Sequence, residues 1–157
     1  MVPSIRVYWL LLLGIAIAPL VAMVQSIPTS IFVTLLYDAV VLGLMVIDGL
    51  RGRSHRVLVS RELPPRLSIG RDNPVVLVVK SGTSKAQIHI RDYFPVNFGV
   101  SRSTLQATVA ANSSSELGYT VCPRSRGEFD WGDIQVRQLG AWGLAWDDWK
   151  IPQRCQL

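Results

Sequence analysis

Two apolar runs near the N-terminus constrain this chain more than any other feature of its sequence. The first covers residues 7–24 and has no charged side chain, and the second covers residues 31–47 with a single acid. A helix that crosses the hydrocarbon core of a bilayer needs about 20 apolar residues, within a range of roughly 17–25. Inside a bilayer each run must satisfy its own backbone polar groups, so each is expected to be helical. The sequence therefore predicts a transmembrane hairpin within residues 1–53.

Positive charge flanks the outer ends of this hairpin. Arg6 precedes the first run, and Arg51, Arg53 and Arg56 follow the second, whereas the link at residues 25–30 has no charge. Lys and Arg favour the cytoplasmic side of a membrane. We therefore expect a multi-pass protein of the inner (plasma) membrane with both termini in the cytoplasm. Membrane lipid is an expected partner, because basic side chains next to a membrane helix can contact anionic head groups.

One acid, Asp38, lies within the second run. An aspartate at that depth costs roughly 2.5–3.5 kcal/mol on insertion scales, so it must face a partner, another chain or a water pocket. It could serve in a proton or ion relay, or it could form a hydrogen bond between helices or be carried in its protonated form. The runs contain no second ionisable group that would continue a relay. A structural role is therefore the favoured interpretation.

Small residues recur at four-residue spacing in both runs. They are Gly14, Ala18 and Ala22 in the first, and Ala39 and Gly43 in the second. Small side chains at this spacing let helix backbones approach closely in lipid. The pattern predicts that both sets lie in the contact between the two helices.

Behind the hairpin the apolar period changes from helical to two. Short segments place alternate apolar residues on one face, as with Ile88 and Ile90 or with Phe129 and Trp131, and turn clusters such as residues 112–115 separate them. Short alternating strands between frequent turns are typical of a β-sandwich. The sequence thus predicts two transmembrane helices followed by an all-β, Ig-like sandwich domain at residues 54–157.

The domain shows no residue pattern of a known reaction. The histidines are not spaced as metal ligands with any cysteine, and no glycine-rich phosphate loop occurs. We therefore predict no catalytic residue, cofactor or metal ligand, and do not expect an enzyme. The net charge of +5 does not indicate nucleic acid, because no basic helix appears and the basic residues do not alternate with aromatic ones.

The best candidate for an interaction surface is an aromatic stretch near the C-terminal end, formed by Trp142, Trp146 and Trp149. Exposed tryptophans often dominate protein interfaces. The alternative is that these rings cap the end of the sandwich. The sequence leaves both interpretations open.

Two short segments of the chain carry a further motif. The first contains Arg126, Gly127, Phe129, Trp131, Gly132 and Ile134, and the second contains Gly143 and Leu144. Together with the order of the features above, these segments resemble the N-terminal part of the MoxR-associated proteins of domain-of-unknown-function family fifty-eight. That family has an R-G-x-aromatic-x-aromatic-G-x-I/V segment, followed by a D-P-x-G-L-like segment. In the second segment this chain lacks the Asp-Pro pair.

The resemblance implies a function without implying a catalytic residue. Family members usually continue into a von-Willebrand-A-like domain, so the chain is expected to be truncated before that domain. The implied activity is that of a membrane-anchored interaction or scaffold module, and the implied partner is a MoxR-type AAA+ ATPase. Two alternatives are a fragment of a larger membrane-bound enzyme or metal-adhesion protein whose active part lies beyond Leu157, and a small transporter that uses Asp38.

Overall fold

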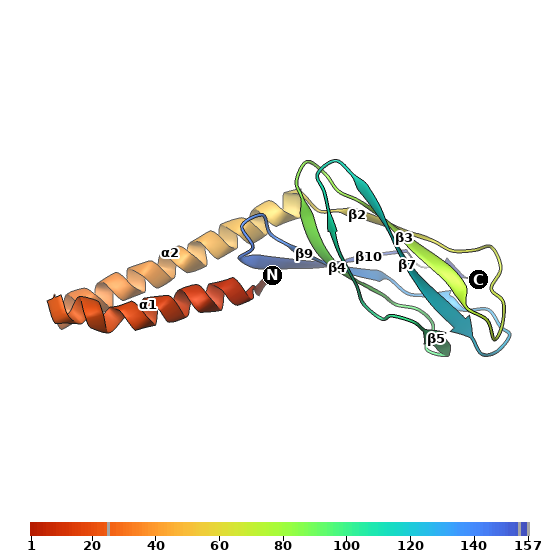
Figure 1. The fold of residues 1–157 in the computed structure, drawn as a ribbon, viewed down its shortest axis with the longest axis horizontal. Coiled ribbons are helices and arrows are strands. Elements are labelled where there is room, and N and C mark those ends of the chain that lie inside the picture. Colours follow the sequence, from red (N-terminus) through yellow and green to blue (C-terminus); the bar gives the residue numbers. More distant parts are fainter. Residues whose placement is uncertain (25, 154, 157) are drawn as a thin grey trace. The chain divides into compact units, whose positions relative to one another are not determined.

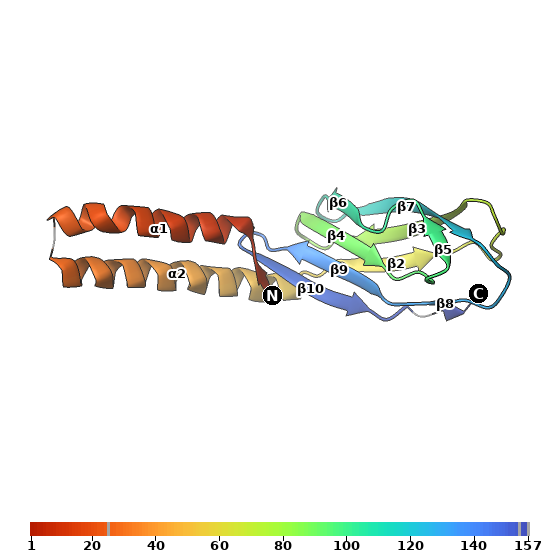
Figure 2. The same cartoon turned by 90° about the horizontal axis from the view of Figure 1, so that it is seen from below.

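The computed structural model describes residues 1–24, 26–153 and 155–156, the last two by their backbone alone. After the short strand β1 come two long helices, α1 at Ile5–Val24 and α2 at Ile27–Ser54, and they run side by side in both views (Figures 1 and 2). Both are long and apolar enough to cross a membrane. Most of their large apolar side chains are exposed, as lipid-facing side chains would be.

The helices extend beyond the predicted runs. The second helix begins inside the predicted link, where the backbone N–H of Ser30 donates to the carbonyl of Ser26 at 3.1 Å, and it continues past Ile47 to Ser54. The prediction of a loop over residues 25–30 was therefore wrong for most of its length. Apolar side chains mark the part of a helix suited to hydrocarbon, but the backbone hydrogen bonds can continue into water.

Hydroxyl groups join the two helices. The Ser30 hydroxyl donates to the carbonyl of Ala18 at 2.8 Å, and the Tyr37 hydroxyl donates to the carbonyl of Leu10 at 3.0 Å. The ring of Tyr37 packs on Gly14, where an added Cβ would approach it to 2.7 Å. The predicted role of Gly14 as a close-contact residue is confirmed.

The matching prediction for the second helix was wrong. Ala39 and Gly43 are exposed, and a Cβ at Gly43 would meet no atom within 4 Å. The face of α2 that contacts α1 instead carries Ser30 and Tyr37. Four-residue spacing identified a face of the helix, but polar side chains able to bond a neighbouring carbonyl determined which face was used.

The remainder of the described chain is built from antiparallel strands. Strands β2, β3, β7 and β5 form one sheet in that order, β1, β10, β9, β4 and β6 form another, and β8 pairs with β11. The prediction of two apolar helices followed by an all-β sandwich is confirmed. The strands are β1 Val2–Pro3, β2 Leu58–Glu62, β3 Asn73–Lys80, β4 Ala86–Asp92, β5 Phe98–Val100, β6 Leu105–Val109, β7 Ser114–Pro123, β8 Asp130–Trp131, β9 Ile134–Leu139, β10 Ala145–Ile151 and β11 Cys155–Gln156.

The core of the sandwich consists of the predicted inward residues. Ile88 and Ile90 of β4 and Ile134 of β9 are fully buried, and so is Trp131. Phe129 is partly buried and packs against them. The alternation of apolar and polar side chains identified these residues because successive side chains of a strand point to opposite faces.

The chain divides into two compact units. The first, called the anchor unit here, comprises Met1–Ser54 and Leu139–Asp147. The second, called the sandwich unit, comprises His55–Gln138 and Asp148–Leu157. The loop between β9 and β10 and the first residues of β10 thus belong with the helices, although they lie far from them in sequence.

Candidate functional site

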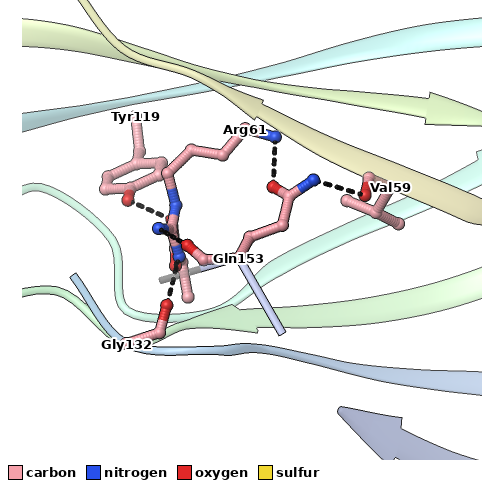
Figure 3. A network of polar contacts seen from close by, with 6 residues as sticks. Val59, Arg61, Tyr119, Gly132 and Gln153 are labelled. Carbon is pink, nitrogen blue, oxygen red and sulfur yellow. Dashed lines mark hydrogen bonds and ion pairs between the residues drawn. The ribbon is translucent and has the colours of Figure 1, made fainter. Parts of the chain in front are cut away.

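A buried ion pair lies at the centre of a polar network in the sandwich unit. The guanidinium of Arg61 donates to both carboxylate oxygens of Asp92, and the two side chains are 2% and 4% exposed. Other guanidinium N–H groups donate to the carbonyl of Gly132 at 2.9 Å and to that of Gln153 at 3.0 Å (Figure 3). A buried ion pair is favourable only when further hydrogen bonds satisfy its remaining groups, as they do here.

Two aromatic side chains complete this network. The hydroxyl of Tyr119 donates to Asp92 at 2.6 Å, and the Arg61 guanidinium lies 5.0 Å from the centre of the Trp131 ring. The network therefore joins β2, β4 and β7 to the segment that carries Trp131 and Gly132. The protein encloses this network. We therefore assign it a structural role in stabilising the sandwich.

Burial raises the pKa of Tyr119 far above its usual 10.0, and the charge and hydrogen bond of Asp92 raise it further. The folded chain thus holds this proton more tightly than the unfolded chain. The resulting stability is fully present below pH 10 and is lost as pH rises above that value. We expect Tyr119→Phe to cost about 1–2 kcal/mol at neutral pH and to flatten the decline above pH 10. Denaturant melts across this range measure both effects.

A suitable control is Tyr93→Phe, since Tyr93 is exposed and its hydroxyl bonds the Gln135 side chain at 3.0 Å. This variant should keep the alkaline decline of the parent. Equal flattening in both variants would contradict the role assigned to Tyr119.

A second buried acid, Asp48, organises the anchor unit. Its side chain is fully buried, and its carboxylate accepts backbone N–H groups from Trp142 at 2.9 Å, Leu144 at 2.9 Å and Ala145 at 3.2 Å. The Ser4 hydroxyl adds a bond to the carbonyl of Gly143 at 2.6 Å. The carboxylate thus fastens the β9–β10 loop to the end of α2. We call this arrangement the juxtamembrane clasp.

The clasp explains why glycine occupies two positions in the loop, where a larger side chain would not fit. A Cβ at Gly140 would collide with the Asp48 carboxylate, and a Cβ at Gly143 would come within 2.6 Å of an Arg6 nitrogen. Gly143 also has a φ of +72°, a left-handed conformation that glycine adopts without a steric penalty. Gly143 and Leu144, which the family resemblance singled out, thus belong to a turn shaped around Asp48 and Arg6.

Asp48→Asn is expected to weaken the clasp. An amide nitrogen cannot accept the N–H bonds that a carboxylate oxygen accepts, and bonds to a charged group contribute about 1.5–3 kcal/mol each. The oxygen of the Asn side chain can still accept from Leu144 and Ala145, which share Oδ2, so the NH2 group faces the N–H of Trp142, which bonds Oδ1. We expect the amide of Trp142 to exchange hydrogen roughly 30-fold faster, which corresponds to about 2 kcal/mol. Hydrogen–deuterium exchange of the full chain in detergent measures this rate.

Asp38→Asn provides the matched control on the same helix. The Oδ1 atom of Asp38 is buried without a hydrogen-bond partner among the described residues, and Gly14 lies beside it. This variant should leave exchange in the β9–β10 loop unchanged. Equal acceleration in both variants, or in neither, would contradict the clasp.

The three predicted interface tryptophans are divided between the two units. Trp142 lies in the anchor unit and is 42% exposed, with the Arg51 guanidinium 5.0 Å from its ring centre. Trp146, in the same unit, is half-buried. Trp149 belongs to the sandwich unit, is partly buried and packs against its core.

The segment at residues 126–134, on which the family resemblance rests, is called the family-like segment here. Part of it lines a groove of about 390 Å³ in the sandwich unit. Arg126, Gly127 and Phe129 form one part of the lining. The rest is mainly apolar, apart from Arg66 and one serine, and it comprises Pro65, Arg66, Leu67, Ile69, Pro123 and Ser125. Arg66 and Arg126 are exposed, and neither forms an ion pair within the described part of the chain.

Within the described residues, no group of three or more His, Cys, Asp or Glu side chains is placed to hold a metal ion. The histidine of β4, His89, is half-buried. Burial lowers its pKa from 6.5, and the nearby charge of Arg137 lowers it further. His89 is therefore mainly neutral at physiological pH.

Together, the two units define a class of protein: a β-sandwich that follows two helices able to span a membrane. No protein-family model and no curated protein sequence matches the chain. Among solved structures, a FixG-related protein from Vibrio parahaemolyticus is similar at 12% identity, covering 62% of this chain and 93% of that chain, with a TM-score of 0.39. The CARDB domain of a Pyrococcus furiosus protein is similar at 8% identity, covering 62% and 87%, with a TM-score of 0.37.

Proposed function

We propose that this chain is a membrane-anchored, non-catalytic interaction module. Helices α1 and α2 would hold it in the inner membrane with both termini in the cytoplasm, an orientation favoured by the arginines at the outer ends of the hairpin. The sandwich unit would then present its binding surface to cytoplasmic proteins.

The groove lined by the family-like segment is the observation that carries this proposal. Its apolar lining would bind an apolar side chain, and Arg66 and Arg126, whose charges form no ion pair among the described residues, would attract acidic residues beside it. The occupant is therefore a segment of a partner protein that combines an apolar anchor with flanking Asp or Glu. Arginines and aromatic side chains are frequent hot-spot residues in such contacts.

The resemblance to the MoxR-associated proteins suggests the partner. Arg126, Gly127 and Phe129 belong to the segment on which that resemblance rests, and they line the groove. We propose that the groove takes an acidic-apolar segment of a MoxR-type AAA+ ATPase.

Binding of the purified ATPase to the full chain in nanodiscs tests this function. The double charge reversal Arg66→Glu and Arg126→Glu is expected to weaken binding at least tenfold, since like charges across an interface are repulsive. The control Arg102→Glu, an exposed site outside the groove lining, should bind as the parent does.

Two results would contradict different parts of the proposal, the partner and the docking surface. If the parent chain does not bind the ATPase, the assigned partner is wrong. If it binds and the double variant binds equally well, the groove is not the docking surface.

A further inference from the structure

Two arginines and a tryptophan meet at the ends of the two helices. Arg6, at the start of α1, donates to the carbonyl of Trp142 at 3.3 Å. Arg51, near the end of α2, places its guanidinium 5.0 Å from the centre of the Trp142 ring. All three residues belong to the anchor unit and all are exposed. The juxtamembrane clasp fixes this arrangement, because Asp48 binds the backbone N–H of Trp142 itself.

The charges of these arginines are not neutralised within the described residues. Arg53 on the same helix pairs with Asp147 at 3.8 Å, whereas Arg6 and Arg51 form no ion pair there. Asp48, the acid beneath the loop, is fully buried and bonded to backbone amides. Each guanidinium has five N–H donors in a planar fork, so most of their donors remain available for an anion.

The position of these three residues along the helices indicates which kind of anion they would bind. Arg6 directly precedes the first apolar run, and Arg51 follows the second. Both therefore lie where hydrocarbon gives way to lipid head groups. An exposed Trp is common at this depth, because its ring is apolar and its N–H is polar.

We propose that Arg6, Arg51 and Trp142 form a binding site for the phosphate of an anionic phospholipid. The guanidinium forks would bind the phosphate oxygens in the bidentate manner typical of arginine, while Trp142 would pack against the glycerol and upper acyl carbons. This inference rests on the proposal that α1 and α2 cross a membrane. It is independent of the groove and of any protein partner.

Native mass spectrometry of the full chain tests the site. The protein is first reconstituted in vesicles of phosphatidylcholine with phosphatidylglycerol and is then extracted in mild detergent. For Arg6→Gln with Arg51→Gln, we expect bound phosphatidylglycerol to fall roughly 25-fold, about fivefold for each charge lost near the membrane. The control Arg71→Gln with Arg102→Gln removes the same charge from exposed sites of the sandwich unit and should bind as the parent does.

A second pair of variants separates a shaped site from general attraction to charge. Arg6→Lys with Arg51→Lys keeps both charges but removes the planar forks, so it should still lose roughly fivefold. Binding equal to the parent in this variant would overturn the site. Displacement of the lipid by millimolar inorganic phosphate would also overturn it, because it would show a site for the free ion.

The reconstitution step distinguishes this inference from the membrane proposal. If the chain fails to float with the vesicles, the proposed anchoring itself is wrong. If it floats but shows no preference for phosphatidylglycerol over phosphatidylcholine, only the headgroup site is wrong.

Discussion

Replacing Arg61 by alanine is expected to lower the free energy of unfolding of the sandwich unit by about 3–5 kcal/mol. The change leaves Asp92 buried without its countercharge, and removing one partner of a buried ion pair typically has a cost of this size. It also leaves the carbonyls of Gly132 and Gln153 without the donors that now reach them. Denaturant melts of the full chain, followed by near-ultraviolet circular dichroism, measure the loss.

The exposed pair of Arg137 and Asp148 provides the control. These side chains are 45% and 24% exposed and lie 3.3 Å apart. Arg137→Ala should cost less than about 1 kcal/mol, because surface ion pairs are screened by water. Equal losses at Arg61 and Arg137 would show that burial does not determine the contribution of the Arg61 pair.

Trp131→Ala is the second change with a large expected effect. The ring is 1% exposed, lies edge-on to Phe98 at 6.1 Å between ring centres, and stacks with Arg61. Truncating a buried Trp to Ala costs about 3–5 kcal/mol, and a domain of this size has only about 5–15 kcal/mol in total. The variant should therefore be largely unfolded at temperatures where the parent is folded.

Two further variants show whether the loss of stability depends on the volume of the ring at position 131 or on the place of that ring in the core. Trp131→Phe should cost less, since it keeps an aromatic ring and removes an indole N–H that has no partner among the described residues. Trp142→Ala should leave the melting temperature of the sandwich unit unchanged, because Trp142 is exposed and lies in the anchor unit. If Trp142→Ala unfolds the sandwich unit and Trp131→Ala melts at the temperature of the parent, the two residues have been assigned to core and surface the wrong way round.

The fold was predictable because its main signals are periodic. Alternation identified Ile88, Ile90 and Trp131 as core residues, and the apolar runs identified both helices. The face of α2 that contacts α1 was not predictable from small residues. That face depends on which hydroxyl can reach a carbonyl of the neighbouring helix, as Ser30 and Tyr37 do.

The polar clusters were harder to predict because their members are distant in sequence. Asp48 lies just beyond the apolar run and nearly 100 residues from the amides that it binds, 97 in the case of Ala145. Likewise, nothing near Arg61 in sequence indicates that its charge is paired with Asp92. An acid just beyond an apolar run and paired glycines in a distant loop are the sequence signals to look for in such chains.

Membrane anchoring with a cytoplasmic sandwich is the central claim, and thiol labelling of intact cells tests it most directly. In a background with Cys122→Ser and Cys155→Ser, single cysteines are introduced as Ser26→Cys, directly before α2, and as Thr83→Cys, at an exposed site between β3 and β4 of the sandwich unit. A membrane-impermeant maleimide should label the cysteine at position 26 on intact cells, and the cysteine at position 83 only after the cells are opened. Labelling at position 83 but not at position 26 on intact cells would contradict the proposed orientation.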